Sequence, residues 1–353
     1  MPEITLAGRK IGPDHAPLVI AEIGINHEGD YAKAERMVRD AAAVGCECVK
    51  FQCHVVADEM SPQAKLVVPG NADVSIYEIM DRCQLSEAEE RKLMDLVQSL
   101  GMIYLSTPFS RAAADRLETM GVPGYKIGSG ECNNFPLVDH IASFGKPVIL
   151  STGMNGMESI AKSVEILRAR KVPYGLMHTT SMYPTPPEKV RLGAMVQLMQ
   201  AFPDAVVGLS DHTLTIYPCL GAAALGATML ERHFTSDKAW PGPDVFLSMD
   251  PQEMKSLIEG SAIIHKALGG AKGILPEEQV TIDLAYVSCV TIAPIKKGEA
   301  FTKANLWVKR PGTGKILAEH FEALLGRTAS QNIDMNTQLD WDLVDGGEKQ
   351  HGA

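Results

Sequence analysis

The sequence predicts an α/β protein whose main part is a closed (β/α)8 barrel, the TIM barrel fold, followed by a small, mostly β C-terminal domain. Three observations lead to this fold. Over roughly the first 280 residues, short apolar runs alternate with amphipathic segments, as in successive parallel βα units. Polar side chains stand at the end of every run. Beyond residue 284, the chain changes to short β-like runs joined by turns.

Eight segments are predicted to be barrel strands, because each is short and apolar and is bounded by glycine, proline or polar residues. They are residues 18–26, 48–52, 102–107, 124–129, 147–152, 174–179, 205–210 and 228–234. A doubly wound open sheet is the main alternative fold. Such a sheet would carry a G-x-G-x-x-G turn after its first strand, which EIGINHEGD does not match, and the chain has no Walker G-x-x-x-x-G-K-[ST] motif.

The segments between the runs have helical periodicity. Residues 30–44 place four apolar side chains on one helical face, namely Ala34, Met37, Val38 and Ala41. Residues 86–100 begin with Ser86 and Glu89, three positions apart, which is the pattern of a capping box at a helix start.

Composition changes mark three parts of the chain. Residues 1–268 form the predicted catalytic barrel. Residues 269–284, GGAKGILPEEQVTIDL, are rich in Gly, Pro and acidic residues and are predicted to be a linker. Residues 285–353, with runs such as YVSCVTIA and LWVKRP, are predicted to be the small second domain.

The bulk composition narrows the class of protein. The chain has 353 residues, a net charge of -10 and 45% hydrophobic residues, which argues against nucleic acid or anionic membranes as partners. No apolar run approaches the ~20 residues of a membrane span, and the first residues lack the apolar core of a signal peptide. The seven cysteines are scattered and form no C-x-x-C pair. We therefore expect a cytoplasmic protein with reduced thiols.

Polar side chains end all eight predicted strands. In chain order they are Glu22 and Asn26; Lys50 and Gln52; Ser106 and Thr107; Lys126, Ser129 and Glu131; Ser151 and Thr152; His178, Thr179 and Ser181; Ser210, Asp211 and His212; and Glu231 and His233. In a barrel these ends meet on one face, where such barrels place their catalytic groups. One polar strand end is an ordinary loop start, but eight of them favour an active site.

Two histidines at neighbouring strand ends predict a metal site. His212 and His233 follow the seventh and eighth strands, and adjacent strands are about 4.8 Å apart, so that both rings can reach one ion. Imidazoles with nearby carboxylates and no cysteine suit a divalent metal such as Mn, Fe, Co or Zn. His178 is expected to be structural, and His27 can be assigned either way.

A second group of strand-end residues suits an anion. Lys50 and Lys126 lie in apolar strands, where a buried ammonium needs a partner. The hydroxyls of Thr107, Ser129 and Ser151 stand at the ends of neighbouring predicted strands. The glycines of Gly128-Ser129-Gly130 let backbone N–H groups approach an anion closely. A cationic pocket beside a metal indicates a phosphorylated substrate and a second, polarisable one.

Several motifs resemble a known family. EIGINHEGD, PGNADVSIYEIM, TPFSRAA, YKIGSGE, YPTP, GLSDHT and ERHF resemble the sialic acid (N-acetylneuraminate) synthases, a family with legionaminate and pseudaminate synthase relatives. The resemblance runs over essentially the whole chain. Its tail, VKRPGTG, is similar to the family's antifreeze-like (SAF) domain.

The resemblance implies a reaction. Phosphoenolpyruvate condenses with an open-chain 2-acetamido sugar, N-acetylmannosamine in the type case, and with water. The products are a nine-carbon 2-keto acid, here N-acetylneuraminate, and phosphate, which leaves with C–O cleavage. A divalent metal, expected to be Mn²⁺ with Mg²⁺ or Co²⁺ as alternatives, would polarise the sugar aldehyde and position water.

The resemblance also implies roles for individual residues. The phosphoenolpyruvate-binding residues would be Lys50, Thr107, Lys126, Ser129, Ser151 and Ser210, with Ser181 at a further family position. The sugar-binding residues would be Gln52, Asn71, Tyr183 and Asp244. The catalytic carboxylates around the metal on His212 and His233 would be Glu22, Glu131 and Glu231. Of these, Glu131 is the favoured candidate for ordering water or relaying protons.

Arg310, in WVKRPG, matches an arginine that the family's small domain places in the barrel of the partner subunit, where it contacts the acetamido group. The resemblance therefore implies a domain-swapped homodimer. Without it, an exposed Lys-Arg pair at a turn would be the preferred interpretation.

One segment departs from the family pattern, and three alternatives stay open. The chain reads HTTS where the family reads HCTN, so that Ser181 replaces an Asn and Thr179 a Cys. This difference allows a 2,4-diacetamido-trideoxy hexose as substrate, giving legionaminate. A pyruvate aldolase with a Schiff base on Lys126 is an alternative of another class, and a non-enzymatic binding role is a weaker one.

Overall fold

The computed structural model describes residues 1–69 and 73–347. The chain divides into two compact units, Met1–Gly269 and Gly270–Ala353, and each is described by itself. The predicted division between residues 268 and 269 lies one residue before this boundary.

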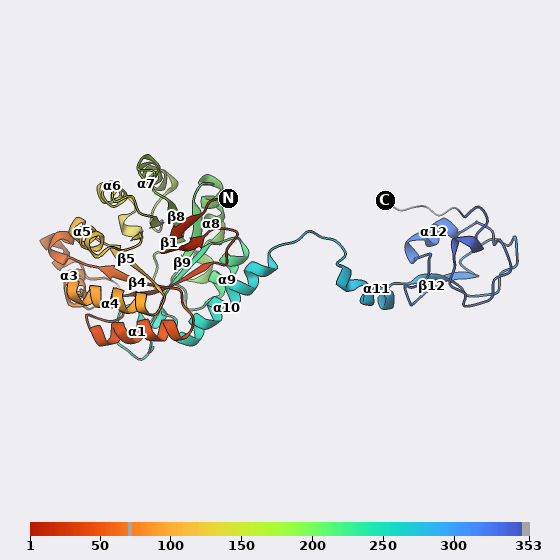
Figure 1. The fold of residues 1–353 in the computed structure, drawn as a ribbon, viewed down its shortest axis with the longest axis horizontal. Helices are drawn as coiled ribbons and strands as arrows, with labels where there is room; N and C mark the ends of the chain where they lie inside the picture. Colours follow the sequence, from red (N-terminus) through yellow and green to blue (C-terminus); the bar gives the residue numbers. More distant parts are fainter. Residues whose placement is uncertain (70–72, 348–353) are drawn as a thin grey trace. The chain divides into compact units, whose positions relative to one another are not determined.

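Eight parallel strands form the centre of the first unit (Figure 1). They are β3 (Leu18–Gly24), β4 (Cys48–Cys53), β5 (Ile103–Pro108), β6 (Tyr125–Ile127), β7 (Val148–Ser151), β8 (Tyr174–Thr179), β9 (Val206–Asp211) and β10 (Met229–His233). Their order is β5-β4-β3-β10-β9-β8-β7-β6, and the two outer strands, β5 and β6, also lie against each other, so that the sheet curls into a barrel. The predicted barrel fold is confirmed.

Helices surround the strands on the outside of the barrel (Figure 1). They are α1 (Tyr31–Ala43), α2 (Val56–Glu59), α3 (Ile76–Cys83), α4 (Glu87–Ser99), α5 (Arg111–Met120), α6 (Phe135–Ala142), α7 (Met157–Ala169), α8 (Leu192–Ala201), α9 (Tyr217–Ala224) and α10 (Pro251–Ala267). The buried residues of α1 are the predicted four, and Ser86 and Glu89 form the predicted capping box at the start of α4. Among the described residues, we find no helix with the length and apolar character that a membrane crossing needs.

The alternation of side chains along each strand divides the barrel interior into two layers. The lower layer is apolar and contains, among others, Leu18, Ile20, Cys48, Leu105, Ile149, Val206 and Met229. The hairpin of β1 (Ile4–Leu6) and β2 (Arg9–Ile11) adds three apolar side chains to this cluster. Gly208 makes the close contact of β9 with β10 possible, since a Cβ there would lie 2.3 Å from the carbonyl oxygen of Met229.

The upper layer of the same interior face is polar. Further along the strands, two residues beyond an apolar position or four in the case of Ser210 after Val206, the same face presents Glu22, Lys50, Thr107, Ser151, Ser210 and Glu231. The barrel closes its lower end with apolar packing, and this leaves the carboxyl ends of the strands to hold the polar groups.

The second unit contains little regular structure. Its elements are α11 (Gln279–Ala285), the antiparallel pair β11 (Ser288–Thr291) and β12 (Leu306–Lys309), and α12 (Phe321–Leu324). Phe301, Leu306 and Ile316 are central to its apolar core. The predicted linker precedes this core, but its last part is helical. A helical turn at Pro276–Glu278 leads directly into α11.

Candidate active site

A cavity of about 400 Å³ opens at the carboxyl ends of the barrel strands. It is called the barrel pocket below. Most of the predicted site residues line it, namely Glu22, Lys50, Gln52, Thr107, Ser129, Ser151, Ser181, Tyr183, Ser210, His212, Glu231, His233 and Asp244. They come from every strand of the barrel or from the loops that follow, which is the arrangement that the polar strand ends predict.

Four predicted residues are not among those lining the pocket. Lys126 lies beneath it and reaches Glu231. The carboxylate of Glu131 accepts a hydrogen bond from Asn134 Nδ2 at 2.5 Å instead of facing the cavity. Arg310 belongs to the second unit, where its guanidinium donates to the carbonyl of Ala285. Asn71 lies outside the described residues.

Two carboxylates and two ammonium groups form a buried network at the floor of the pocket. Glu22 Oε2 lies 2.7 Å from Lys50 Nζ, and Glu231 Oε1 lies 3.1 Å from Lys126 Nζ. Lys50 Nζ is also 3.8 Å from Glu231 Oε1, which links the two pairs. All four side chains are at most 6% exposed. The two positive and two negative charges balance. Removing any one of the four side chains would leave an uncompensated buried charge, which is strongly destabilising.

The network shifts the protonation equilibria of its members. Burial disfavours the charged carboxylate of Glu231, but Lys126 and Lys50 outweigh burial and hold its pKa at about 2. Burial also opposes the charge of Lys50, yet Glu22 and Glu231 outweigh it and raise the pKa of this ammonium. For Lys126, burial is the larger effect and lowers the pKa. Glu231 is therefore held as an anion beside two cations.

Hydroxyl and amide groups next to the buried charge network are suited to binding an anion. The hydroxyl of Ser129 accepts a hydrogen bond from the N–H of Gly153 at 3.0 Å. Asn155 Nδ2 braces the same loops by donating to the carbonyls of Ser129 and Gly153 at 2.9 and 2.7 Å. The buried hydroxyl of Ser151 has no hydrogen-bond partner among the described residues. An unpaired buried hydroxyl in a pocket is a donor available to a ligand.

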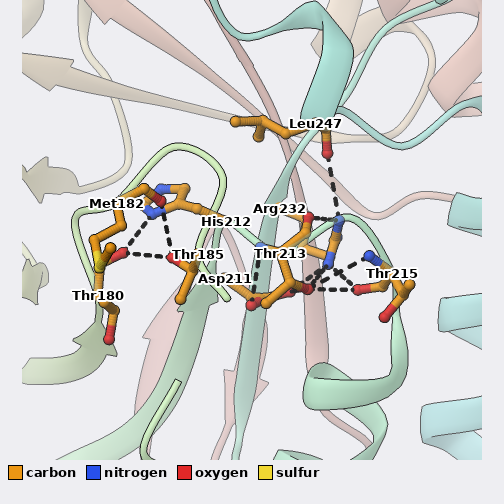
Figure 2. Close-up of polar contacts among 9 residues, drawn as sticks. All are labelled: Thr180, Met182, Thr185, Asp211, His212, Thr213, Thr215, Arg232 and Leu247. Carbon is orange, nitrogen blue, oxygen red and sulfur yellow. Dashed lines mark hydrogen bonds and ion pairs between the residues drawn. The ribbon is translucent and has the colours of Figure 1, made fainter. Parts of the chain in front are cut away.

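The two predicted metal ligands lie side by side above the network. The ring centroids of His212 and His233 are 5.4 Å apart, and the ring of Tyr183 is 4.2 Å from that of His212. His212 Nδ1 donates to the carbonyl of Thr180 at 2.9 Å, which leaves Nε2 with a free electron pair (Figure 2). Burial, and then the neighbouring His233, lower the pKa of His212 to about 3.

These features fit a divalent metal. A metal needs neutral imidazoles with a free nitrogen, and the bond to Thr180 selects this state for His212. His233 Nδ1 is buried and accepts no hydrogen bond from the described residues, while Asp244 Oδ2 lies 3.8 Å away from it. Within residues 1–69 and 73–347, no group of three His, Cys, Asp or Glu side chains is placed to hold an ion.

Arg232, between Glu231 and His233 in the sequence, does not belong to the pocket. It faces the outside of the barrel and forms a buried ion pair with Asp211 (Figure 2). Its guanidinium also donates to the carbonyls of Thr213 and Leu247, at 2.7 and 3.4 Å. Successive side chains of a strand point to opposite faces. In ERHF, Glu231 and His233 therefore face the pocket, whereas Arg232 faces the outside of the barrel and supports the structure there.

The barrel pocket also has an apolar part, which the pattern of polar strand ends does not indicate. This part consists of Ile25, Ile76, Met80, Phe109 and Met154. Ile76 and Met80 are four residues apart on α3, and this helical spacing was the one available signal. An apolar wall facing cationic and hydroxyl groups suits a sugar derivative that carries methyl groups.

His27 has a structural place and supports a prediction about pH. Its ring is buried, and Nδ1 accepts a hydrogen bond from the N–H of Gly29 at 3.0 Å. Burial is the main cause that lowers the pKa of His27 to about 4. The unfolded chain, with an ordinary pKa near 6.5, then binds more protons than the folded chain between about pH 4 and 6.5, so that stability falls as the pH is lowered through this window.

We expect His27→Gln to remove this pH dependence. Between pH 7 and pH 5, the wild type should lose about 2 kcal/mol more of its free energy of unfolding than the variant does. Urea unfolding at several pH values measures the difference. His265→Gln, in the last turn of α10, is the matched control and should keep the wild-type slope. An unchanged slope in His27→Gln would contradict the assignment.

Comparison with known proteins points to a single family. The profile of the NeuB family matches residues 37–273, and the profile of the SAF domain matches residues 286–345. The chain is 38% identical over 324 residues to an N,N'-diacetyllegionaminic acid synthase of Campylobacter jejuni, covering 89% of this chain and 96% of the relative. It is 31% identical over 348 residues to the N-acetylneuraminate-9-phosphate synthase of Homo sapiens, covering 97% of each.

A solved structure agrees with these relatives. The N-acetylneuraminic acid (sialic acid) synthetase from Leptospira borgpetersenii serovar Hardjo-bovis, in complex with citrate, matches with a TM-score of 0.73 and 30% identity, covering 79% of this chain and 95% of that chain. The resemblance to the sialic acid synthases and the predicted SAF domain are confirmed. The chain therefore belongs to the NeuB family and, like its sugar-acid synthase relatives, is an enzyme.

Proposed function

We propose that the chain is an N-acetylneuraminate synthase, which condenses phosphoenolpyruvate with N-acetylmannosamine and water and releases phosphate. The buried charge network beside the two histidines carries the proposal. Lys50 on β4 and Lys126 on β6 supply the cations that a phosphorylated carboxylic acid needs. The His212–His233 pair lies in the same pocket, where an aldehyde could approach.

Residues of the chain would bind and orient phosphoenolpyruvate. Its phosphate and carboxylate would receive hydrogen bonds from the ammonium of Lys50 and the hydroxyls of Ser129 and Ser151, which line the pocket, while Lys126 would contribute its charge from beneath the floor. This leaves its C3 free to form a bond to the aldehyde carbon of the sugar. Positive charge then develops at C2, and the carboxylates of Glu22 and Glu231 are placed to stabilise it.

Water addition at C2 completes the reaction. The water oxygen bonds to C2, a proton leaves, and the tetrahedral product loses phosphate by cleavage of the C2–O bond. Glu231 Oε2 is buried and accepts no hydrogen bond within the described residues, so that it can orient this water. The sugar would contact Gln52, Tyr183 and Asp244, which line the same pocket.

His212 and His233 would hold a divalent metal, for which we propose Mn²⁺, with Mg²⁺ or Co²⁺ as alternatives. When bound, such an ion supplies Lewis-acid polarisation of the aldehyde oxygen. The hydrogen bond of His212 to Thr180 sets the ring nitrogen that faces the ion.

A diacetamido-trideoxy hexose, giving legionaminate, is the second candidate for the sugar. The Campylobacter jejuni relative with that product name shares 38% identity with the chain, against 31% for the human relative. The apolar wall with Ile76 and Met80 suits extra methyl groups, and Ser181 replaces the family Asn.

One assay separates these candidates. Metal-stripped protein would be resupplied with Mn²⁺ and incubated with phosphoenolpyruvate and either N-acetylmannosamine or 2,4-diacetamido-2,4,6-trideoxymannose, and phosphate release and product mass would be followed. We expect a nine-carbon acid from N-acetylmannosamine that depends on metal. Turnover of the diacetamido sugar alone would support the legionaminate reading. Turnover of neither, together with borohydride trapping of pyruvate on Lys126, would support an aldolase.

We further propose a homodimer in which Arg310 reaches the barrel of the partner subunit. Two observations support it. After the barrel strands, the chain exposes large apolar side chains, among them Met154, Leu214, Tyr217 and Phe246, and α11 exposes Val280 and Leu284. Exposed apolar groups of this number favour an interface.

Mixing two inactive variants tests the swapped dimer. Arg310→Ala should lose sugar binding and Glu231→Gln should lose turnover, so that each is nearly inactive alone. In a mixed dimer, one site combines the intact barrel of the Arg310→Ala subunit with the intact Arg310 of the Glu231→Gln subunit, and the other site lacks both groups. After subunit exchange, we expect about a quarter of the wild-type activity to return. No recovery from fully exchanged dimers would refute the shared site.

A further inference from the structure

Behind the barrel pocket, a chain of hydrogen bonds connects two carboxylates through an imidazole and an amide. Gln52 Nε2 donates to Glu22 Oε1 at 3.0 Å, and Gln52 Oε1 lies 3.1 Å from His54 Nε2. His54 Nδ1 lies 2.7 Å from Glu59 Oε2. Gln52 and Glu22 line the pocket, whereas His54 and Glu59 stand behind them.

This chain of groups is built into the fold. The side chains of His54 and Glu59 are 2% and 9% exposed, and the ring of His54 stacks on Phe109 with centroids 4.7 Å apart. Glu59 lies on α2, which is anchored because Asp58 accepts a hydrogen bond from the N–H of Ala112 at 2.9 Å. Neither ring nitrogen of His54 is left to solvent, so both of its bonds hold the ring in place.

Counting hydrogens decides how the groups are oriented. Glu22 Oε2 pairs with the ammonium of Lys50 at 2.7 Å, and in this ion pair the carboxylate only accepts hydrogen bonds. Gln52 must therefore turn its NH₂ group toward Glu22 and its oxygen toward His54. That oxygen accepts, so His54 Nε2 must carry a hydrogen.

The other end of the chain follows in the same way. His54 Nδ1 and Glu59 Oε2 lie 2.7 Å apart and share one further hydrogen. Both ring nitrogens of His54 are therefore engaged, and the bond to Glu59 fixes the ring so that Nε2 donates to Gln52. If His54 lost the Nε2 hydrogen, Gln52 would have to rotate and would bring its oxygen against Glu22.

We propose that His54, held by Glu59, is a positioning residue that sets the side-chain amide of Gln52 for binding the sugar substrate. The amide then presents N–H donors to Glu22 and to the pocket, never its oxygen. This inference rests on the proposed function, since Gln52 is assigned to the sugar there. Within the described residues, the hydrogen bonds of His54 go to Gln52 and Glu59 and not to Lys50, Ser129 or Ser151, so binding of phosphoenolpyruvate should not depend on it.

The first test is a double-mutant cycle. His54→Leu should raise KM for the sugar about tenfold, the cost of one misplaced hydrogen-bonding group, with KM for phosphoenolpyruvate unchanged. In a Gln52→Ala background, His54→Leu should add less than about twofold, because its effect acts through Gln52. His54→Gln, whose amide can still donate to Gln52, should recover most of the loss.

Two outcomes would overturn the proposal. One is an unchanged sugar KM in a folded, active His54→Leu variant. The other is an equal loss in both backgrounds or an equal rise in both KM values, which would mean a general structural role.

The second test does not depend on turnover. In ¹H–¹⁵N NMR spectra of wild-type protein at pH 7, Nε2 of His54 should carry a hydrogen, and Glu59→Gln, which no longer fixes the ring, should give signals averaged between both tautomers. The signals are assigned by their absence in His54→Gln. A His54 ring without a hydrogen on Nε2 in the wild type would overturn the proposal. If the wild type turns over neither sugar but Nε2 of His54 carries its hydrogen, the proposed function fails and the orientation of Gln52 stands.

Discussion

Replacing Arg232 with methionine is expected to lower the free energy of unfolding by about 3–5 kcal/mol. The substitution leaves Asp211 buried without its ion partner, and it removes the donor to the carbonyls of Thr213 and Leu247. Burial already outweighs the attraction of Arg232 and raises the pKa of Asp211, so an unpaired carboxylate there is costly. Urea unfolding followed by far-UV circular dichroism would measure the loss.

A matched double variant separates the charge from the packing. In Arg232→Met with Asp211→Asn, no uncompensated charge remains, and we expect at least half of the lost stability to return. Arg232→Lys keeps the charge but loses the planar fork that reaches several carbonyls, so its stability should fall between the wild type and Arg232→Met. A loss below about 1 kcal/mol in Arg232→Met would show that the pair contributes little.

The second large effect concerns the histidine pair. His233→Gln and His212→Gln are each expected to lower kcat/KM by a factor of about 10³ or more, because in the proposed reaction the loss of one imidazole would weaken metal binding and with it the polarisation of the aldehyde, by several kcal/mol. Metal content after dialysis should fall in step with activity. Isothermal titration with Mn²⁺ measures the affinity independently of turnover.

The control is the same substitution elsewhere. His265→Gln, in the last turn of α10 and outside the pocket lining, should keep both metal content and activity. If His233→Gln bound Mn²⁺ as tightly as the wild type, the metal would have to lie at another site. If it lost the metal but kept its activity, the reaction would not need the ion.

Local patterns were enough to predict the barrel. Each strand is a short apolar run with a polar end, and each covering helix carries its own apolar stripe, as in α1 with Met37 and Val38. These signals depend on neighbours within a few residues, so they can be read along the chain. The gathering of the strand-end residues in one pocket then follows from barrel topology alone.

Sequence order does not show the direction of a side chain. Glu131 follows a strand like the other candidates, but the turn Ser129–Glu131 directs its carboxylate to Asn134. His178, expected to be structural, and Arg232 point outward from strands whose neighbouring residues point inward. Because side chains alternate between the two faces of a strand, the position of a residue within its strand decides whether its side chain points inward or outward. A strand boundary misplaced by one residue reverses the predicted direction.

The sequence by itself therefore determined the fold class, the position of the pocket and most of the chemical groups in it. Only the tertiary structure decided which groups pair. Lys126 and Glu231 are 105 residues apart, and their ion pair exists because the barrel brings β6 and β10 around one interior. The orientation of Gln52 likewise depends on His54 and Glu22 together. Pairing between buried polar groups depends on distances of about 3 Å set by the closed sheet, and no local pattern contains those distances.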